Sequence, residues 1–116
     1  MTSVQLPPLR ASSRPRPRDT RSCPAHRAWV RRHACSVPGC LASPIECAHV
    51  RRGTDGGQSL KPSDRYTISL CQAHQAEQHR IGEARFEARY AIDLKALADA
   101  FARRSPHWRV LLGAER

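Results

Sequence analysis

Cysteine and histidine residues form two closely spaced pairs in this chain. Cys35 and Cys40 flank the sequence Ser-Val-Pro-Gly, which predicts a tight turn that brings two thiolates to one ion. Cys71 and His74 are separated by two residues at the start of a predicted helix. Four soft ligands in two local pairs match a tetrahedral structural zinc site. A single cysteine is more often a small buried hydrophobic residue, but two such pairs together favour zinc.

The composition indicates why this chain needs a metal. Its 116 residues leave room for one small domain, and nine prolines, six glycines and an aromatic content of only 5% predict a thin core. In a reducing compartment its five cysteines are better explained as ligands than as disulfides. Cys47 is close enough in sequence to be a substitute ligand, whereas we expect no metal role for Cys23.

The N-terminus lacks the continuous hydrophobic segment of a signal peptide, and no stretch approaches the roughly 20 apolar residues that cross a bilayer. We therefore expect a cytoplasmic protein that does not contact a membrane. An Arg-rich, Ser-containing N-terminus is also found in transit peptides, although the prolines here oppose the amphipathic helix of such peptides.

The charge of the chain points to a phosphate-bearing partner. Twenty Lys and Arg residues, most of them arginine, stand against ten Asp and Glu residues, which gives a formal net charge of +10. Residues 1–22 combine arginines with four prolines, and we expect a disordered basic arm. This arm would be either a solubilising tail or a non-specific DNA contact.

The remaining chain predicts a small α+β domain over residues 23–104, followed by a C-terminal tail over residues 105–116. Asp93 is expected to cap the second of two C-terminal helices. These helices would form an amphipathic pair that covers the metal-containing unit, with a partner-binding surface as the alternative. The predicted elements are a helix at 24–33, a strand at 45–50, a loop at 51–64, a strand at 66–70, a helix at 72–80 and two helices within 83–104.

Three segments carry a resemblance to a known family: Ala-His-Val around His49, Lys-Pro-Ser-Asp ending at Asp64, and Leu-Cys-Gln-Ala-His-Gln-Ala-Glu-Gln-His ending at His79. Together with the Cys pair and the Gly-rich loop, they resemble the HNH, or ββα-metal, endonuclease family. They are most similar to a small branch found in bacteria and prophages. The similarity runs from about His26 to about Phe101. The resemblance implies a zinc-stabilised ββα-metal fold with additional C-terminal helices.

The resemblance also implies roles for individual residues. His49 matches the general base that removes a proton from the attacking water, and Asp64 matches the residue that organises the loop and orients this base. Gln75 and His79 fall on the helix positions that hold a catalytic divalent ion, Mg²⁺ or another, one turn apart on one face. Cys35, Cys40, Cys71 and His74 fall on the structural zinc positions.

Hydrolysis of a phosphodiester requires such a set of groups. Water must be deprotonated near neutral pH, which a histidine can do. The charge that develops on the phosphate and the leaving oxygen must be neutralised, which a divalent ion does as a Lewis acid. Arg51, Arg52 and Lys61 lie in the loop beside His49, where they would either clamp the phosphate or form a solvated loop face.

We therefore expect a metal-dependent enzyme, an HNH-type endonuclease that hydrolyses DNA phosphodiester bonds. Gln75 replaces the second consecutive histidine of the family, and a Gln carbonyl binds a hard ion more weakly; Glu46 or Glu77 could supply a further ligand. Ala48 precedes the base where many members carry an acidic or His ligand, although the Ala-His form occurs in the resembling branch. The alternative is a zinc-containing module that binds nucleic acid without cleaving it, and a third reading is a zinc-stabilised protein-interaction domain.

Overall fold

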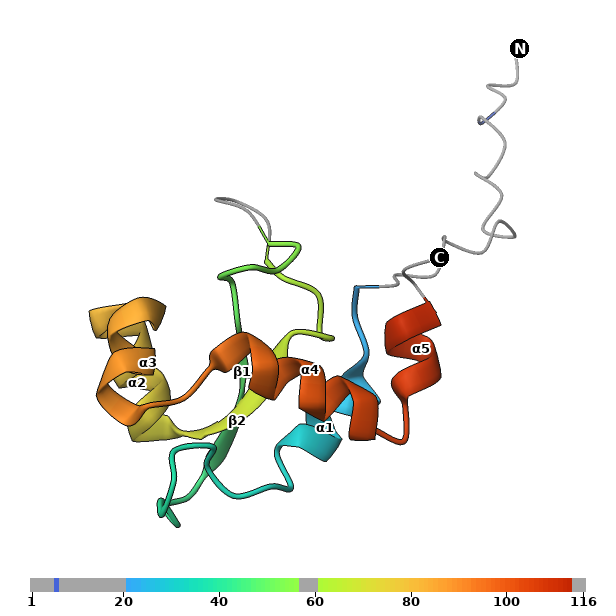
Figure 1. Ribbon diagram of the computed structural model, residues 1–116. Helices are drawn as coiled ribbons and strands as arrows, with labels where there is room; N and C mark the ends of the chain where they lie inside the picture. The colour runs from blue at the N-terminus through green and yellow to red at the C-terminus, as the bar shows by residue number, and fades with distance from the viewer. Residues whose placement is uncertain (1–5, 7–20, 57–60, 114–116) are drawn as a thin grey trace.

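Two antiparallel strands lie at the centre of a small α+β fold, and helices surround them (Figure 1). This computed structural model describes residue 6, residues 21–56 and residues 61–113. The predicted order of strand, long loop, strand and helix is confirmed. The elements are α1 (Pro24–Val30), β1 (Ile45–His49), β2 (Thr67–Cys71), α2 (Gln72–Ile81), α3 (Glu83–Tyr90), α4 (Leu94–Arg104) and α5 (Trp108–Gly113).

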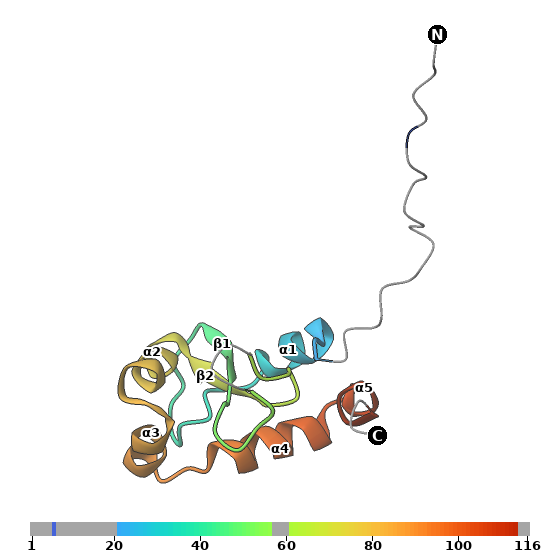
Figure 2. The same cartoon turned by 90° about the horizontal axis from the view of Figure 1, so that it is seen from above.

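The strands pair so that His49 at the end of β1 lies opposite Thr67 at the start of β2. The alternating sequence of residues 66–70 correctly predicts a strand, but burial does not alternate, because every residue of β2 is buried. The reason is that β2 is covered on both sides, by α1 on one and by α4 on the other (Figure 2). The small polar side chains of β2 are buried together with hydrogen-bond partners, as Thr67 and Ser69 show.

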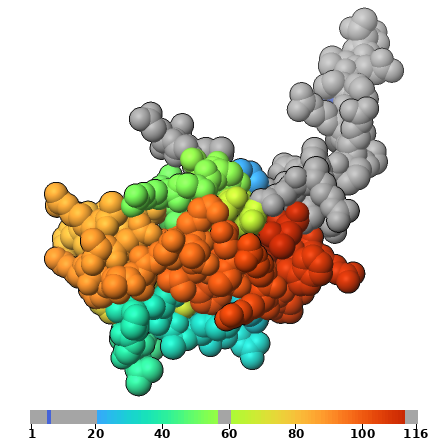
Figure 3. Space-filling model, in the orientation of Figure 1, coloured from blue at the N-terminus to red at the C-terminus, as the bar shows by residue number. Residues whose placement is uncertain are grey.

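The C-terminal helices cover the core as the amphipathic pattern predicted. Phe86 of α3 and Leu94 and Ala98 of α4 are fully buried in one cluster with Ile68 of β2. The predicted cap is confirmed, since Asp93 Oδ1 accepts a hydrogen bond of 3.0 Å from the backbone N–H of Ala96. In the space-filling view α4, in orange, lies across the face of the molecule above the cyan segment that contains α1 (Figure 3).

The expected C-terminal tail, residues 105–116, contains a further helix. Helix α5 forms there, and Leu111 packs with Cys23 and Ala102 in a second apolar cluster. Ser105, which precedes α5, is also buried and lies 2.8 Å from His26 Nδ1. A six-residue helix carries too few residues for a periodic signal in the sequence. Its contacts with α4 and with Cys23 are visible only in the structure.

The basic arm expected over residues 1–22 falls outside the described residues, except for Leu6, Arg21 and Ser22. Arg21 is tied to the domain, because its guanidinium forms an ion pair of 2.9 Å with Asp55. None of the helices in the described ranges has both the length and the apolar character needed to cross a bilayer.

Candidate functional site

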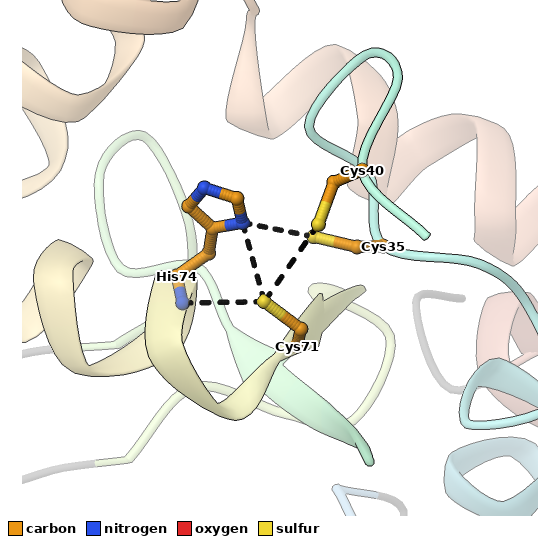
Figure 4. A group of neighbouring side chains, drawn as sticks. All are labelled: Cys35, Cys40, Cys71 and His74. Carbon is orange, nitrogen blue, oxygen red and sulfur yellow. Dashed lines mark hydrogen bonds between the residues drawn. The ribbon is translucent and has the colours of Figure 1, made fainter. Parts of the chain in front are cut away.

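The predicted zinc ligands come together in one cluster (Figure 4). The ligand atoms of Cys35, Cys40, Cys71 and His74 all lie within 4.8 Å of one another. His74 Nδ1 is 3.4 Å from Cys35 Sγ and 3.2 Å from Cys71 Sγ, and the sulfurs of Cys40 and Cys71 are 3.9 Å apart. Ligands of a tetrahedral zinc ion are separated by roughly 3.5–3.8 Å. The cluster could therefore hold a metal ion, and its donor set is compatible with structural zinc.

Local backbone geometry brings the two ligand pairs together. The backbone N–H of Cys40 donates to the carbonyl of Val37 at 3.0 Å, and Gly39 has a φ of +79°. This is a type II turn, in which Pro fits the second position and Gly the third. Cys71 ends β2 and caps α2, where its sulfur accepts from the backbone N–H of His74. The turn and the strand-to-helix junction thus face each other.

The other two cysteines lie outside this cluster. None of the five cysteines is in a disulfide. Cys23 is buried in the second apolar cluster, and half-buried Cys47 lies opposite Ser69 in the strand pair. Burial raises the pKa of the Cys47 thiol, so Cys47 is protonated at neutral pH. Neither cysteine completes the metal cluster.

His49 and Asp64 form the second predicted pair. His49 Nε2 lies 2.9 Å from Asp64 Oδ1, although 15 positions separate the residues. The other oxygen, Oδ2, accepts a hydrogen bond of 2.6 Å from the backbone N–H of Cys23 and a further one from the Arg27 guanidinium. Only 6% of the Asp64 side chain is exposed. Burial alone would raise the pKa of Asp64, but the hydrogen bonds from His49, Cys23 and Arg27 outweigh it and lower the pKa to about 2.

This carboxylate determines which histidine nitrogen can act as a base. An ionised carboxylate only accepts hydrogen bonds, so His49 must carry its proton on Nε2. The lone pair of the neutral ring is then on Nδ1. In the neutral form of the ring, Nδ1 is therefore the nitrogen of His49 that can accept a proton.

A buried hydrogen-bond chain supports Asp64 from the other side. Thr67 Oγ1 donates to the backbone carbonyl of Asp64 at 2.8 Å and lies 3.2 Å from His26 Nε2. His26 is fully buried, and desolvation lowers its pKa to about 4 despite the nearby Asp64 charge. Because the Thr67 hydroxyl already donates, a neutral His26 supplies the Nε2 proton to Thr67 and accepts from Ser105 at Nδ1.

His49 opens into a cavity of about 400 Å³ at the end of the strand pair. Glu83 shapes this cavity, because its two carboxylate oxygens accept hydrogen bonds of 2.8 Å from the backbone N–H groups of Arg51 and Arg52. Predicted residues Arg51, Arg52 and His79 line the same cavity, but Gln75 and Lys61 do not. The full lining is His49, Arg51, Arg52, Gln78, His79, Gly82 and Glu83.

Three residues of this site were not predicted from the sequence: Arg27, Gln78 and Glu83. Gln78 is 4% exposed, and its Nε2 is buried without a hydrogen-bond partner in the part of the chain that the structure describes. Its position next to His79 is the only signal, since two adjacent helix residues at the last turn can border one cavity. Arg27 and Glu83 lie far from their partners in sequence, so no local pattern reveals them.

Within the described ranges, the residues around His49 do not form a second cluster of three or more metal ligands. Among the described residues, the Cys35, Cys40, Cys71 and His74 cluster is the only group of three or more such ligands. Gln75 does not border the cavity of His49. Glu77 is hydrogen-bonded by Tyr90 and lies 3.2 Å from the Arg89 guanidinium, and neither Glu77 nor Glu46 lines the cavity. His79 is therefore the one expected ligand of a catalytic ion that lies beside His49.

The comparisons with known proteins assign a family. Comparisons with curated proteins and with solved structures give no match. The family model described as "Protein of unknown function (DUF968)" matches residues 5–105, which is most of the chain. The chain therefore belongs to the DUF968 family.

Proposed function

We propose that this protein is an HNH-type endonuclease that hydrolyses nucleic-acid phosphodiester bonds, most simply those of DNA. The observation that carries the proposal is the imidazole of His49, hydrogen-bonded to the buried carboxylate of Asp64 and lining a cavity that arginines also line. The order of strands and α2 around a Cys and His cluster supports an HNH ββα-metal fold. In that fold the cluster would hold structural zinc and join the turn to α2.

His49 is the general base of the proposed reaction. Its Nδ1 takes a proton from a water molecule, which then attacks phosphorus. Asp64 remains ionised, fixes the ring through Nε2 and stabilises the imidazolium that forms. Because Asp64 occupies Nε2, Nδ1 is the ring nitrogen that remains for the attacking water.

The cavity supplies donors for the phosphate. Arg52 is positioned by an ion pair of 2.8 Å with Glu87, and Glu83 fixes the backbone that carries Arg51. The partnerless Nε2 of Gln78 would donate to a phosphate oxygen and so become satisfied in the complex. Lys61 does not line the cavity and has no part in this arrangement.

A bound divalent ion would supply Lewis-acid stabilisation of the phosphate and leaving group. The chain offers His79 toward such an ion, and one imidazole is not the oxygen-rich set that Mg²⁺ prefers. Proton transfer and phosphate binding as described above use protein groups alone.

Nicking of supercoiled plasmid tests the proposal. Zinc-loaded protein is incubated with plasmid and with Mg²⁺, Mn²⁺ or Ni²⁺ in separate reactions. We expect nicked circles from the wild type and a loss of at least about 100-fold in His49→Ala. His107→Ala is the matched control, because His107 lies beside α5 and outside the cavity. Undiminished nicking by a folded His49→Ala protein would refute the assignment of the base.

The absence of a second ligand cluster among the described residues favours one alternative, a module that binds nucleic acid without cleaving it. This alternative predicts plasmid binding that weakens steeply with salt, without nicking. Under this alternative, Gln75→His restores cleavage only if the missing histidine ligand at position 75 is the sole defect. Gain of nicking by Gln75→His in an otherwise silent protein would locate the lost activity at position 75.

A further inference from the structure

A second cavity lies between α1 and α4 and shares no lining residue with that of His49. It has a volume of about 360 Å³ and is bordered by three rings. The centroid of Trp29 is 4.5 Å from that of His33 and 5.9 Å from that of Phe101, all in edge-to-face arrangements. We call this the aromatic groove. Its lining comes from α1, from the segment that follows α1, from β2 and from α4.

One exposed arginine lines the aromatic groove, and three more lie close to its lining residues in the sequence. Arg104 lines it, Arg103 precedes Arg104, and Arg31 and Arg32 follow α1 directly after the turn that carries Trp29. Within the described residues, none of these four guanidinium groups has an acidic partner. Other arginines of the domain do: Arg27, Arg52 and Arg89 pair with Asp64, Glu87 and Glu77, respectively.

Unpaired arginines beside aromatic rings are suited to one class of ligand. Phosphates of a nucleic-acid strand would satisfy the arginines, and an unstacked base would occupy the cavity and pack against the rings that border it. Two serines add polar groups to the lining of the groove: Ser69 Oγ donates to the Ala34 carbonyl at 2.7 Å and lies 3.1 Å from Ser36 Oγ. Ser36 then donates to Ser69 and keeps acceptor capacity for an N–H group on a base edge.

We propose that the aromatic groove binds an unstacked base of single-stranded nucleic acid, with Arg104 and its neighbours on the flanking phosphates. The proposal rests on nucleic acid as the partner class of the proposed function, but it does not require cleavage. A protein with such a groove would bind single-stranded or frayed segments more tightly than intact duplex.

Two oligonucleotides of equal charge separate base stacking from phosphate contacts. One is a 12-residue oligothymidine, and the other has the same length but only abasic sites. Binding is measured by anisotropy at low salt without added divalent ions, so that cleavage does not interfere. We expect the oligothymidine to bind about tenfold more tightly, in line with stacking of one base. Equal affinities would overturn the proposal, because the surface would then contact phosphates only.

Fluorescence places the base at the groove. In a Trp108→Phe background Trp29 is the only tryptophan, and its emission should be quenched by oligothymidine and not by the abasic strand. Phe101→Leu should remove most of the tenfold preference, and Arg104→Gln should weaken both oligonucleotides. Arg85→Gln is the matched control, an exposed arginine on α3 away from the groove. A preference for bases that survives in a folded Phe101→Leu protein would refute the site.

These outcomes are independent of the endonuclease proposal. His49→Ala should bind oligothymidine as the wild type does while losing nicking. Nicking that depends on His49, together with unchanged binding in the groove variants, would refute the groove and retain the endonuclease. Quenching of Trp29 by oligothymidine in a protein that never nicks would retain the groove and refute the endonuclease.

Discussion

At the scale of single residues, Asp64 connects the candidate site to the core. One oxygen holds the proposed base, and the other receives Arg27 and the backbone of Cys23. A carboxylate with three charged or N–H donors is stable in a buried position, which explains its lowered pKa. The ring of His49 is therefore oriented before any substrate binds.

Gln78 provides a test in which stability and activity move in opposite directions. Gln78→Met keeps the length of the side chain and removes the buried Nε2 that lacks a partner. We expect the free energy of unfolding to rise by about 1 kcal/mol in urea titrations, because an unsatisfied polar group is lost. Nicking should slow by roughly tenfold if this group donates to the phosphate. Gln72→Met, at an exposed position of α2, is the control, and unchanged nicking in Gln78→Met would contradict the role.

His26 makes stability depend on pH. Its pKa falls from 6.5 in the unfolded chain to about 4 in the folded protein, so the unfolded state binds more protons between these values. Stability should be fully present above pH 6.5 and decline as the pH falls toward 4, by about 2 kcal/mol at pH 5. Urea titrations at pH 7.5 and pH 5 measure this difference. His26→Gln should show a smaller decline, and an equal decline would assign the effect to other groups.

At the scale of elements, α4 is the helix that closes one side of β2, and its first turn depends on Asp93. Asp93→Ala should lower the free energy of unfolding by about 1 kcal/mol, because the backbone N–H of Ala96 loses its acceptor. Asp93→Ser retains a capping oxygen and should stay within about 0.5 kcal/mol of the wild type. Thermal and urea unfolding measure both variants. A loss in Asp93→Ser as large as in Asp93→Ala would show that the cap is not the cause.

The elements that the sequence predicted are those with a local signal. Pro and Gly mark the turn before Cys40, β-branched residues mark β1 and β2, and apolar spacing marks α3 and α4. Helix α5 was not predicted because a tertiary contact, that of Leu111 with Cys23 and Ala102, stabilises it, and the local sequence carries no signal for it. The same limit applies to the site. The roles of His49 and Asp64 were predicted from a resemblance. The presence of Gln78 and Glu83 at the site could not be predicted, because it depends on how α2 is oriented relative to β1.

At the scale of the whole molecule, the Cys and His cluster joins segments far apart in the chain. We expect one zinc per chain, and Cys40→Ser should lose it and melt at a markedly lower temperature. Cys47→Ser is the matched control, since Cys47 lies outside the cluster and should keep the metal. Elemental analysis and melting with and without a strong zinc chelator measure both effects. A chelator-treated protein that melts like the untreated one would contradict a structural metal.

Chemical rescue of the general base is the most direct test of the mechanism. His49→Gly removes the imidazole at a position that opens into the cavity, while Asp64 keeps Arg27 and the Cys23 backbone as partners. The rate of plasmid nicking by His49→Gly should be at least about 100-fold below that of the wild type. Added imidazole should raise the rate of the variant about tenfold, and the increase should saturate with imidazole concentration. Imidazole should not accelerate the wild type. Wild-type nicking by a folded His49→Gly protein without imidazole would contradict a catalytic role for His49.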